Sequence, residues 1–377
     1  MARKLRVGVI FGGQSGEHEV SLRSAGSVIQ AIDNARYEII PVGISKEGKW
    51  LSPPHAAALL SETTQARLPN KITPIPDKDV AILGDPSHRG LITLNANNSS
   101  QSSEPLDIVF PLLHGPYGED GTIQGLLEMA NVPYVGCGVL ASSCGMDKVA
   151  MKSLFREAGL PICKHIWFLR SEWRKDPDGI YRLVKQKLGY PCFVKPANLG
   201  SSVGVSKASD KKSLAQAIEL AARYDRKIII EENINGREVE CAILGNDDPQ
   251  ASLPGEYVIH EESARFLDYT EKYSSTGHVE FVVPARLSKA LTEKIQRMAI
   301  KAFKAVDGAG LARVDFFVTQ DNQLLVNELN TMPGLTDVSG YPKMWAASGL
   351  SFQQLIDRLV ELAFERHQDK MQNKTSL

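Results

Sequence analysis

Short apolar runs alternate with helical periodicity in the first 145 residues of the chain. Residues 7–11 form a β-branched run that ends at two glycines, Gly12 and Gly13. Apolar side chains then recur at steps of three and four residues, as on one face of an α-helix. These positions are Leu22, Ala25, Ile29 and Ile32. Two further apolar runs, at residues 37–44 and 106–113, predict strands. The order of strand, glycine loop, helix and strand is typical of an α/β layer.

Residues 52–104 interrupt this pattern. The segment is rich in Pro, Ser and Asn and ends in a polar run at residues 95–103. Such a composition buries little apolar surface. We expect a surface excursion here, partly disordered and without chemistry.

From about residue 146 the pattern changes to short strands and helices that do not repeat a regular β-α-β unit. Strands are predicted at residues 193–195, 203–207, 228–231 and 238–244, and helices at 211–222 and 288–306. The first two strands flank a polar loop and can form a hairpin. The last helix begins at a capping box made by Ser351 and Gln354. The C-terminal part is therefore predicted to be α+β.

Composition narrows the classes of function. The 43 Lys and Arg balance 44 Asp and Glu, so the net charge is −1, without the basic excess of a nucleic-acid-binding protein. No apolar run approaches the roughly 20 residues of a membrane span, and residues 7–11 are too short for the core of a signal peptide. The five cysteines are scattered without a Cys-x-x-Cys pair. We expect a cytoplasmic protein that binds neither nucleic acid nor membrane.

A pair of carboxylates is predicted on one hairpin. If residues 311–318 and 323–330 pair around a turn at Asp321 and Asn322, Asp315 faces Glu328 and Arg313 faces Asn330. Two opposed carboxylates repel each other, so a cation is expected between them. Oxygen ligands of this kind suit Mg²⁺ carried by nucleotide phosphates. The alternative is a solvent-facing hairpin with unrelated charges. The apolar character of the opposite faces disfavours it, and those faces carry Val314, Phe316, Leu325 and Leu329.

A glycine-rich and serine-rich loop follows Lys195. Gly200 and Gly204 allow backbone N–H groups to approach an anion, and Ser201 and Ser202 add hydroxyls. The loop is not a Walker A motif, because no Gly-Lys-Ser/Thr follows. Taken alone it is more often an ordinary turn. A second lysine, Lys148, and the acidic hairpin favour a phosphate site.

Seven motifs together resemble a known family. Met146-Asp147-Lys148 and residues 193–196, 200–204, 312–315 and 327–336 resemble the ATP-grasp signature. With Gly12-Gly13 and residues 16–22, and with residues 113–115 and 118–121, the resemblance narrows to the D-alanine–D-alanine ligase family. It covers nearly the whole chain. It implies an N-terminal Rossmann-like parallel sheet followed by a two-lobed ATP-grasp fold. The expected domains are a substrate-binding domain at 1–145, a central ATP-grasp lobe at 146–235 and a C-terminal ATP-grasp and metal-binding domain at 236–377.

The resemblance implies a reaction and its nucleotide-binding residues. ATP phosphorylates the carboxylate of one D-alanine, and the amine of a second D-alanine attacks the acyl phosphate, which gives D-alanyl-D-alanine for peptidoglycan precursors, with ADP and phosphate. Two Mg²⁺ ions, or Mn²⁺ in their place, are expected on Asp315, Glu328 and Asn330. The residues expected to bind ATP are Lys148, Lys195, Ser201, Ser202, Glu231, Ile234, Glu238 and Lys272.

The substrate residues follow from the same resemblance. Glu17 would hold the ammonium of the first D-alanine, and His114 would lie near its carboxylate. On composition alone, a first-turn acid favoured by the helix dipole is the preferred interpretation of Glu17, and a loop histidine that of His114; the family resemblance reverses this preference. Arg313 and the backbone N–H of Gly334 would stabilise the oxyanion of the tetrahedral intermediate. Ser339 would anchor the second substrate.

Residues 265–273 resemble the mobile loop that closes over the site. Lys272 would point at the transferred phosphate, and Tyr273 would connect through Ser201 to Glu17. Leu267 stands where the family leads us to expect tyrosine. A homodimer is expected from the family alone.

Two other functions remain open from the sequence. A ligase that joins D-alanine to D-lactate is disfavoured by Tyr273, since lactate-using members depart from tyrosine in this loop. A nucleotide-binding protein without catalysis is disfavoured by the joint presence of Arg313, Asp315, Glu328 and Asn330. Binding alone does not require them.

Overall fold

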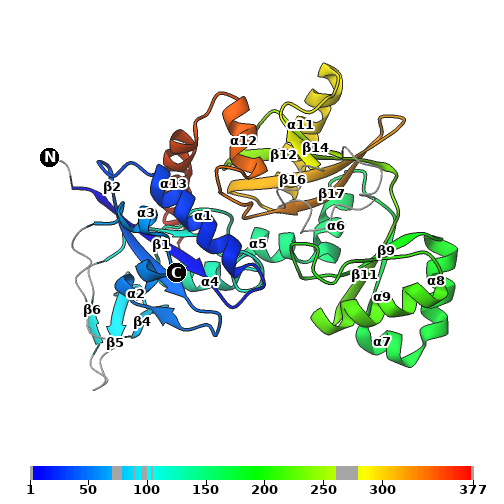
Figure 1. Cartoon of the computed structure of the whole chain (residues 1–377), viewed down its shortest axis with the longest axis horizontal. Helices are drawn as coiled ribbons and strands as arrows, with labels where there is room; N and C mark the ends of the chain where they lie inside the picture. The colour runs from blue at the N-terminus through cyan, green and yellow to red at the C-terminus, as the bar shows by residue number, and fades with distance from the viewer. Residues whose placement is uncertain are drawn as a thin grey trace.

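The structure, a computed structural model, describes residues 3–69, 79–88, 90–94, 100–102, 105–259 and 279–374. Figure 1 shows a parallel sheet near the N-terminus at one end and an antiparallel sheet around β9 and β11 at the other, with the sheet around β12, β16 and β17 between them. The expected mixed α/β fold class is confirmed.

The first sheet has the order β3-β2-β1-β7. Strands β1 (Leu5–Gly12), β2 (Tyr37–Ile44) and β7 (Ile108–Pro111) are parallel, and the short β3 (Trp50–Leu51) is antiparallel to β2. Helix α1 (His18–Ala31) follows the glycine loop. All three predicted strands are therefore present, in a Rossmann-like arrangement.

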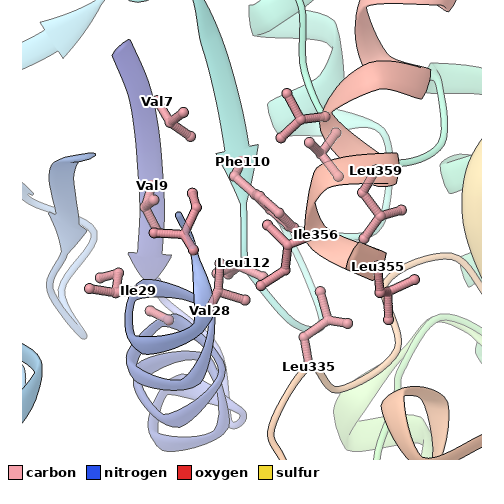
Figure 2. Close-up of a cluster of buried hydrophobic side chains, with 14 of the residues drawn as sticks. Val7, Val9, Val28, Ile29, Phe110, Leu112, Leu335, Leu355, Ile356 and Leu359 are labelled. Atoms are coloured by element: carbon pink, nitrogen blue, oxygen red, sulfur yellow. The ribbon is translucent and has the colours of Figure 1, made fainter. Parts of the chain in front are cut away.

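Both faces of this sheet are covered. On one face, Val7, Val9 and Phe110 pack with α1 and with α13 (Phe352–Lys370), as Figure 2 shows. Helix α12 (Gly340–Ala347) adds Trp345 to the same core. The other face packs against α4 (Thr122–Met129). The last helix of the chain thus completes the core of the first sheet.

The segment at residues 52–104, expected to be a partly disordered surface excursion, is ordered in its described part. That part forms α2 (Pro53–Ala58), α3 (Glu62–Gln65) and an antiparallel sheet of β4 (Asp79–Ile82), β5 (Leu91–Leu94) and β6 (Ser100–Ser102). Val80, Ile82 and Leu91 are buried in the core of the first sheet. The segment is polar in composition, but the burial of these few apolar side chains is enough to stabilise its short helices and strands.

The second sheet, β10-β9-β11-β8, is antiparallel. The chain reaches it through α5 (Val139–Met146) and α6 (Lys148–Glu157), whose N-cap is Asp147. The sheet consists of β8 (His165–Leu169), β9 (Cys192–Pro196), β10 (Ser206–Ala208) and β11 (Lys227–Glu232). Its covering helices are α7 (Arg170–Lys175), α8 (Pro177–Lys187) and α9 (Lys211–Tyr224). Ser206 pairs with Val194, so the predicted hairpin is confirmed.

The third sheet runs β15-β14-β12-β16-β17, with β13 paired to β12. Its strands are β12 (Gly236–Gly245), β13 (Gln250–Ala251), β14 (Gly255–Ile259), β15 (Val279–Val282), β16 (Gly310–Thr319) and β17 (Leu324–Asn330). Helix α11 (Lys289–Ala305) packs on it. Its N-cap is Ser288, where the predicted helix began.

The hairpin of β16 and β17 contains a β-bulge that the sequence did not predict. Asp315 pairs with Glu328 and Arg313 with Asn330, as expected. Nearer the turn, Phe316 pairs with Val326, so Asn327 is the extra residue. The expected placement of Leu325 on the apolar face is therefore wrong. Leu325 pairs with Phe317, and its neighbours Leu324 and Val326 are buried instead.

Two compositional expectations can be compared with the fold. All five cysteines are free, and four of them are buried. None of the helices in the described part of the chain has the length and apolar character needed to cross a bilayer.

Candidate active site

A cavity of about 510 Å³ lies between the second and third sheets. This volume is in the range that holds a cofactor-sized ligand. One wall comes from β9, β11 and the loop at 199–205, and the other from β12, β14, β16 and β17. The lining residues that were expected to bind nucleotide or metal are Lys148, Lys195, Ser201, Ser202, Glu231, Ile234, Glu238, Asp315 and Glu328.

A buried carboxylate between two lysines forms the back of the cavity. The Glu231 carboxylate is 2.7 Å from Nζ of Lys195 and 2.9 Å from Nζ of Lys152. Burial by itself would raise the pKa of Glu231, but the two ammonium groups outweigh burial and hold the pKa far below its usual value. Glu231 is therefore ionised and keeps Lys195 in place at the cavity wall.

Lys148 begins helix α6 and points into the cavity. Its ammonium donates to the carbonyl of Leu199 at 2.6 Å and lies 3.9 Å from Oε2 of Glu328. Burial lowers the pKa of Lys148, and Glu328 opposes the shift. A single lysine thus joins the glycine-rich loop to the acidic hairpin.

The loop after β9 has a strained backbone. Ser201 and Ser202 have φ of 52° and 56°, in the left-handed region that non-glycine residues adopt rarely and at a cost. The hydroxyl of Ser201 donates a hydrogen bond to the carboxylate of Glu17. The loop over the cavity is thereby tied to the N-terminus of α1 in the first domain.

Glu17 has a carboxyl neighbour. Glu119 is buried, and its Oε2 accepts a 2.6 Å hydrogen bond from the backbone N–H of Gly115. Burial raises the pKa of both carboxyl groups, and the charge of Glu17 raises that of Glu119 further. Gly115 has a φ of 74°, which favours glycine, and a Cβ there would lie 2.7 Å from Oε2 of Glu17, so a larger residue would displace that carboxylate.

His114 is fixed between helix α1 and the segment after β17. Its Nδ1 lies 3.1 Å from the carbonyl of Met332 and its Nε2 lies 3.1 Å from the hydroxyl of Ser24. A neutral ring that donates from Nδ1 and accepts at Nε2 satisfies both partners. Burial lowers the pKa of His114 to about 4. The imidazole is therefore neutral at physiological pH.

Arg313 is held by two carboxylates. It makes a bidentate pair with Asp315, with two contacts of 2.7 Å, and lies 3.4 Å from Glu240. Asp315 and Glu240 outweigh the burial of Arg313, so its guanidinium stays charged. Arg313 thus places a positive charge beside Asp315, and Lys148 places one 3.9 Å from Glu328.

The last expected residues lie at the end of β17 and in the segment that follows it. Oδ1 of Asn330 accepts a 2.9 Å hydrogen bond from the N–H of Met332. Asn330 does not line the cavity described above. Ser339 is the N-cap of α12, and its hydroxyl is 2.6 Å from that of Thr336. A Cβ at Gly334 would lie 2.9 Å from Oγ of Ser339, so the two residues are close neighbours. Lys272 and Tyr273 lie outside the described residues.

The donor groups fit a divalent cation of the magnesium type. Asp315 and Glu328 oppose each other at the cavity wall and offer hard oxygen donors. The described residues hold no group of three or more His, Cys, Asp or Glu arranged to hold a metal ion. A cation bound to these two carboxylates would therefore need further ligands, which phosphate oxygens or water can provide.

Sequence reasoning missed Lys152 and assigned no role to Glu119. Lys152 follows Lys148 by four residues, a spacing that places both on one helix face, so it could have been found. Glu119 lies in a motif that the resemblance used, but its burial depends on tertiary packing.

The fold and cavity define a protein of the ATP-grasp class, in which two antiparallel sheets enclose the nucleotide site beside a parallel sheet. Family models described as D-ala D-ala ligase N-terminus and C-terminus match residues 6–137 and 154–361. The chain belongs to the D-alanine–D-alanine ligase family.

Individual relatives are similar to this chain over almost its full length. The D-alanine--D-alanine ligase of Bacillus cytotoxicus is 46% identical, with 99% of each chain covered. That of Bacillus velezensis is 48% identical, covering 96% of this chain and 98% of its own. Two solved structures are also similar. The D-alanine-D-alanine ligase from Coxiella burnetii has a TM-score of 0.81 and 38% identity, covering 98% and 97% of the two chains. The VanG D-Ala:D-Ser ligase from Enterococcus faecalis has a TM-score of 0.82 and 36% identity, covering 96% and 100%.

Proposed function

We propose that this chain joins two D-alanine molecules into D-alanyl-D-alanine at the expense of ATP, for the synthesis of peptidoglycan precursors. The γ-phosphoryl group passes to a carboxylate oxygen of the first D-alanine, and ADP leaves. The amine of the second D-alanine then attacks the acyl carbon, the amide bond forms, and phosphate and a proton leave. Membership of the family over the whole chain supports this reaction.

The observation that carries the proposal is the hydrogen bond from Ser201 to Glu17. It joins the loop of the nucleotide cavity to the carboxylate proposed to hold the first ammonium. A carboxylate attacking a triphosphate must lie next to it, and this contact supports the proposal that the substrate site adjoins the nucleotide site.

Different residues of the cavity are proposed to bind different parts of the nucleotide. Lys148, Lys195 and the loop at 200–204 are proposed to neutralise the phosphates. Glu231, the backbone near Ile234 and Glu238 are proposed to receive the adenine and ribose. Since both oxygens of Glu231 already face lysines, its first effect is to orient Lys195.

Asp315, Glu328 and Asn330 are the proposed metal ligands. Two Mg²⁺ ions, or Mn²⁺, would reduce the charge repulsion between the phosphates and the incoming carboxylate. Arg313 and the N–H of Gly334 would stabilise the negative oxygen that develops when the amine attacks. Lys272 and Tyr273 would close the site, and Ser339 would hold the second carboxylate.

His114 is proposed to lie against the first substrate as a neutral group. Its Nδ1 bond to the carbonyl of Met332 fixes the ring. A neutral imidazole adds no charge beside the substrate carboxylate, so its contribution would be orientation.

The test is a competition for the acceptor. The purified protein is given ATP, Mg²⁺ and D-alanine, with D-lactate and D-serine at equal concentration, and the products are identified by mass spectrometry. We expect D-alanyl-D-alanine to dominate, with one phosphate released for each dipeptide. D-serine is included because a similar structure is a D-Ala:D-Ser ligase. Predominance of the ester or of a D-seryl product would reassign the acceptor, and ATP binding without phosphate release would indicate a non-catalytic protein.

Three further expectations complete the proposal. The chain is expected to form a homodimer, to act in the cytoplasm, and to divide into domains at 1–145, 146–235 and 236–377. Light scattering after gel filtration tests the first, cell fractionation the second and limited proteolysis the third.

A further inference from the structure

Lys152 is a buried lysine outside the proposed ligand set. Its side chain is 1% exposed, and its ammonium reaches three parts of the chain. It is 2.9 Å from the Glu231 carboxylate on β11, donates to the carbonyl of Asn327 on β17 at 2.9 Å, and contacts Sγ of Cys163 at 3.5 Å. The contacts with Asn327 and Cys163 are hydrogen bonds, and the contact with Glu231 is an ion pair.

The carbonyl of Asn327 belongs to the extra residue of the β-bulge. Asp315 pairs with Glu328 and Phe316 pairs with Val326, so Asn327 has no partner residue across the ladder. An unpaired backbone group inside a protein is costly unless another group satisfies it. Lys152 does so from helix α6.

The bulge decides which way Glu328 points. Without it, the pairing of Phe316 with Val326 would continue, and Asp315 would face Asn327. Glu328 would then oppose Val314, whose side chain is fully buried in the apolar core. A slip of one residue sends a side chain to the other face of a sheet. With the pairing observed next to the turn, the two carboxylates can oppose each other only if the bulge is maintained.

A second residue of the same helix secures the other side of Glu328. Sδ of Met151 lies 3.1 Å from the backbone N of Leu329, which donates to it. Strand β17 is at the edge of its sheet, so its outer backbone groups need partners from elsewhere. Met151 and Lys152 supply them on either side of Glu328.

We infer that Lys152, assisted by Met151, is a positioning residue that maintains the bulge at Asn327 and so holds the Glu328 carboxylate opposite Asp315 for the metal. The inference rests on the proposed function. Its alternative is that Lys152 only neutralises Glu231. In that case, removing either partner of the ion pair should have the same effect.

The experiment compares four variants: Lys152→Met, Met151→Leu, Glu231→Gln and, as a matched control, Lys304→Met at an exposed lysine of α11. The first readout is the dissociation constant of Mn²⁺ in the presence of ADP, measured by electron paramagnetic resonance of the free ion. The second is the KM for D-alanine. Circular dichroism and urea unfolding establish that each variant is folded.

Lys152→Met should weaken Mn²⁺ binding by about ten-fold or more, the usual effect of losing a group that orients a metal ligand. Met151→Leu should weaken it by about two- to five-fold, because the lost N–H···S contact is weak. Glu231→Gln keeps the bond to Asn327, so at saturating ADP its loss of Mn²⁺ affinity should be clearly smaller than that of Lys152→Met, even though Glu231 also belongs to the proposed nucleotide site. The KM for D-alanine should change little in Lys152→Met and Met151→Leu, and Lys304→Met should behave as the unaltered chain.

Equal Mn²⁺ affinities in Lys152→Met and the unaltered chain would overturn the inference, as would equal losses in Lys152→Met and Glu231→Gln. If Lys152→Met does not fold, the Mn²⁺ affinity of Met151→Leu becomes the test of the inference. Its volume-conserving change is well tolerated in a core, and unchanged Mn²⁺ binding there would overturn the inference. Failure of the proposed function would appear differently, as an unaltered chain that makes no dipeptide.

Discussion

The neutral state of His114 predicts a specific loss of stability in acid. The ordinary histidine pKa is 6.5, and that of His114 in the fold is about 4, because burial disfavours the charged ring. The unfolded chain therefore binds a proton at a higher pH than the folded chain does. The contribution of His114 is intact above pH 6.5 and is lost progressively as the pH falls from 6.5 to 4.

The magnitude follows from the two pKa values. Full protonation of the unfolded ring, with the folded ring neutral, corresponds to a penalty of about 3 kcal/mol. At about pH 5 the penalty is already about 2 kcal/mol, and near pH 7.5 it is negligible. The ring is 4% exposed, so solvent screening does little to reduce this figure.

The assay is urea unfolding of the unaltered chain and of His114→Asn at about pH 7.5 and about pH 5. Asparagine keeps a donor for the Met332 carbonyl but does not titrate. The fall in unfolding free energy between the two pH values should be smaller in His114→Asn by about 2 kcal/mol. His55→Asn, at an exposed histidine, serves as the control. If His114→Asn loses as much stability in acid as the unaltered chain does, the buried neutral imidazole is not the cause.

Three other substitutions test separate parts of the molecule. Glu328→Gln should lower turnover by about ten-fold or more at saturating Mg²⁺, with the fold retained because repulsion with Asp315 is relieved; near-native turnover would contradict the metal assignment. Tyr273→Phe should gain D-alanyl-D-lactate synthesis by up to about ten-fold, most clearly near pH 6 where the amine of D-alanine is protonated. An ester fraction unchanged at low and high pH would remove the main sequence support for D-alanine as acceptor. Leu359→Ala, at a fully buried side chain labelled in Figure 2, should lower the free energy of urea unfolding by about 2–5 kcal/mol, and a loss below about 1 kcal/mol would show that the contact is not part of a packed core.

In the acidic hairpin of β16 and β17, the sequence pattern predicted part of the strand pairing. Alternation along two strands correctly predicted that Asp315 faces Glu328. It could not predict the bulge at Asn327, because a bulge depends on a partner from another element, here Lys152. The turn-centred register was therefore correct at the site and wrong next to the turn, where Leu325 was assigned to the apolar face.

Contacts across domains were the least predictable part of the site. Periodicity located the strand with Glu231, but no local pattern indicates that two lysines from β9 and α6 converge on its carboxylate. The same holds for His114, whose partners Ser24 and Met332 are 90 and 218 residues away in the chain. The family resemblance singled out His114 as a substrate-site residue. The neutral state of its imidazole, however, follows only from its burial in the fold.

The packing of α13 on the first sheet bears on how the chain folds as it leaves the ribosome. Protein synthesis delivers β1, β2 and β7 long before residues 352–370, whose side chains Leu355, Ile356 and Leu359 cover them. Translation adds about 5–20 residues per second, so on the order of ten seconds or more pass before α13 is synthesised and can pack on this apolar face. During that interval the nascent N-terminal segment exposes a surface of the kind that chaperones bind. A gene fragment that ends near residue 137 would keep that surface permanently, and its product should aggregate when expressed alone.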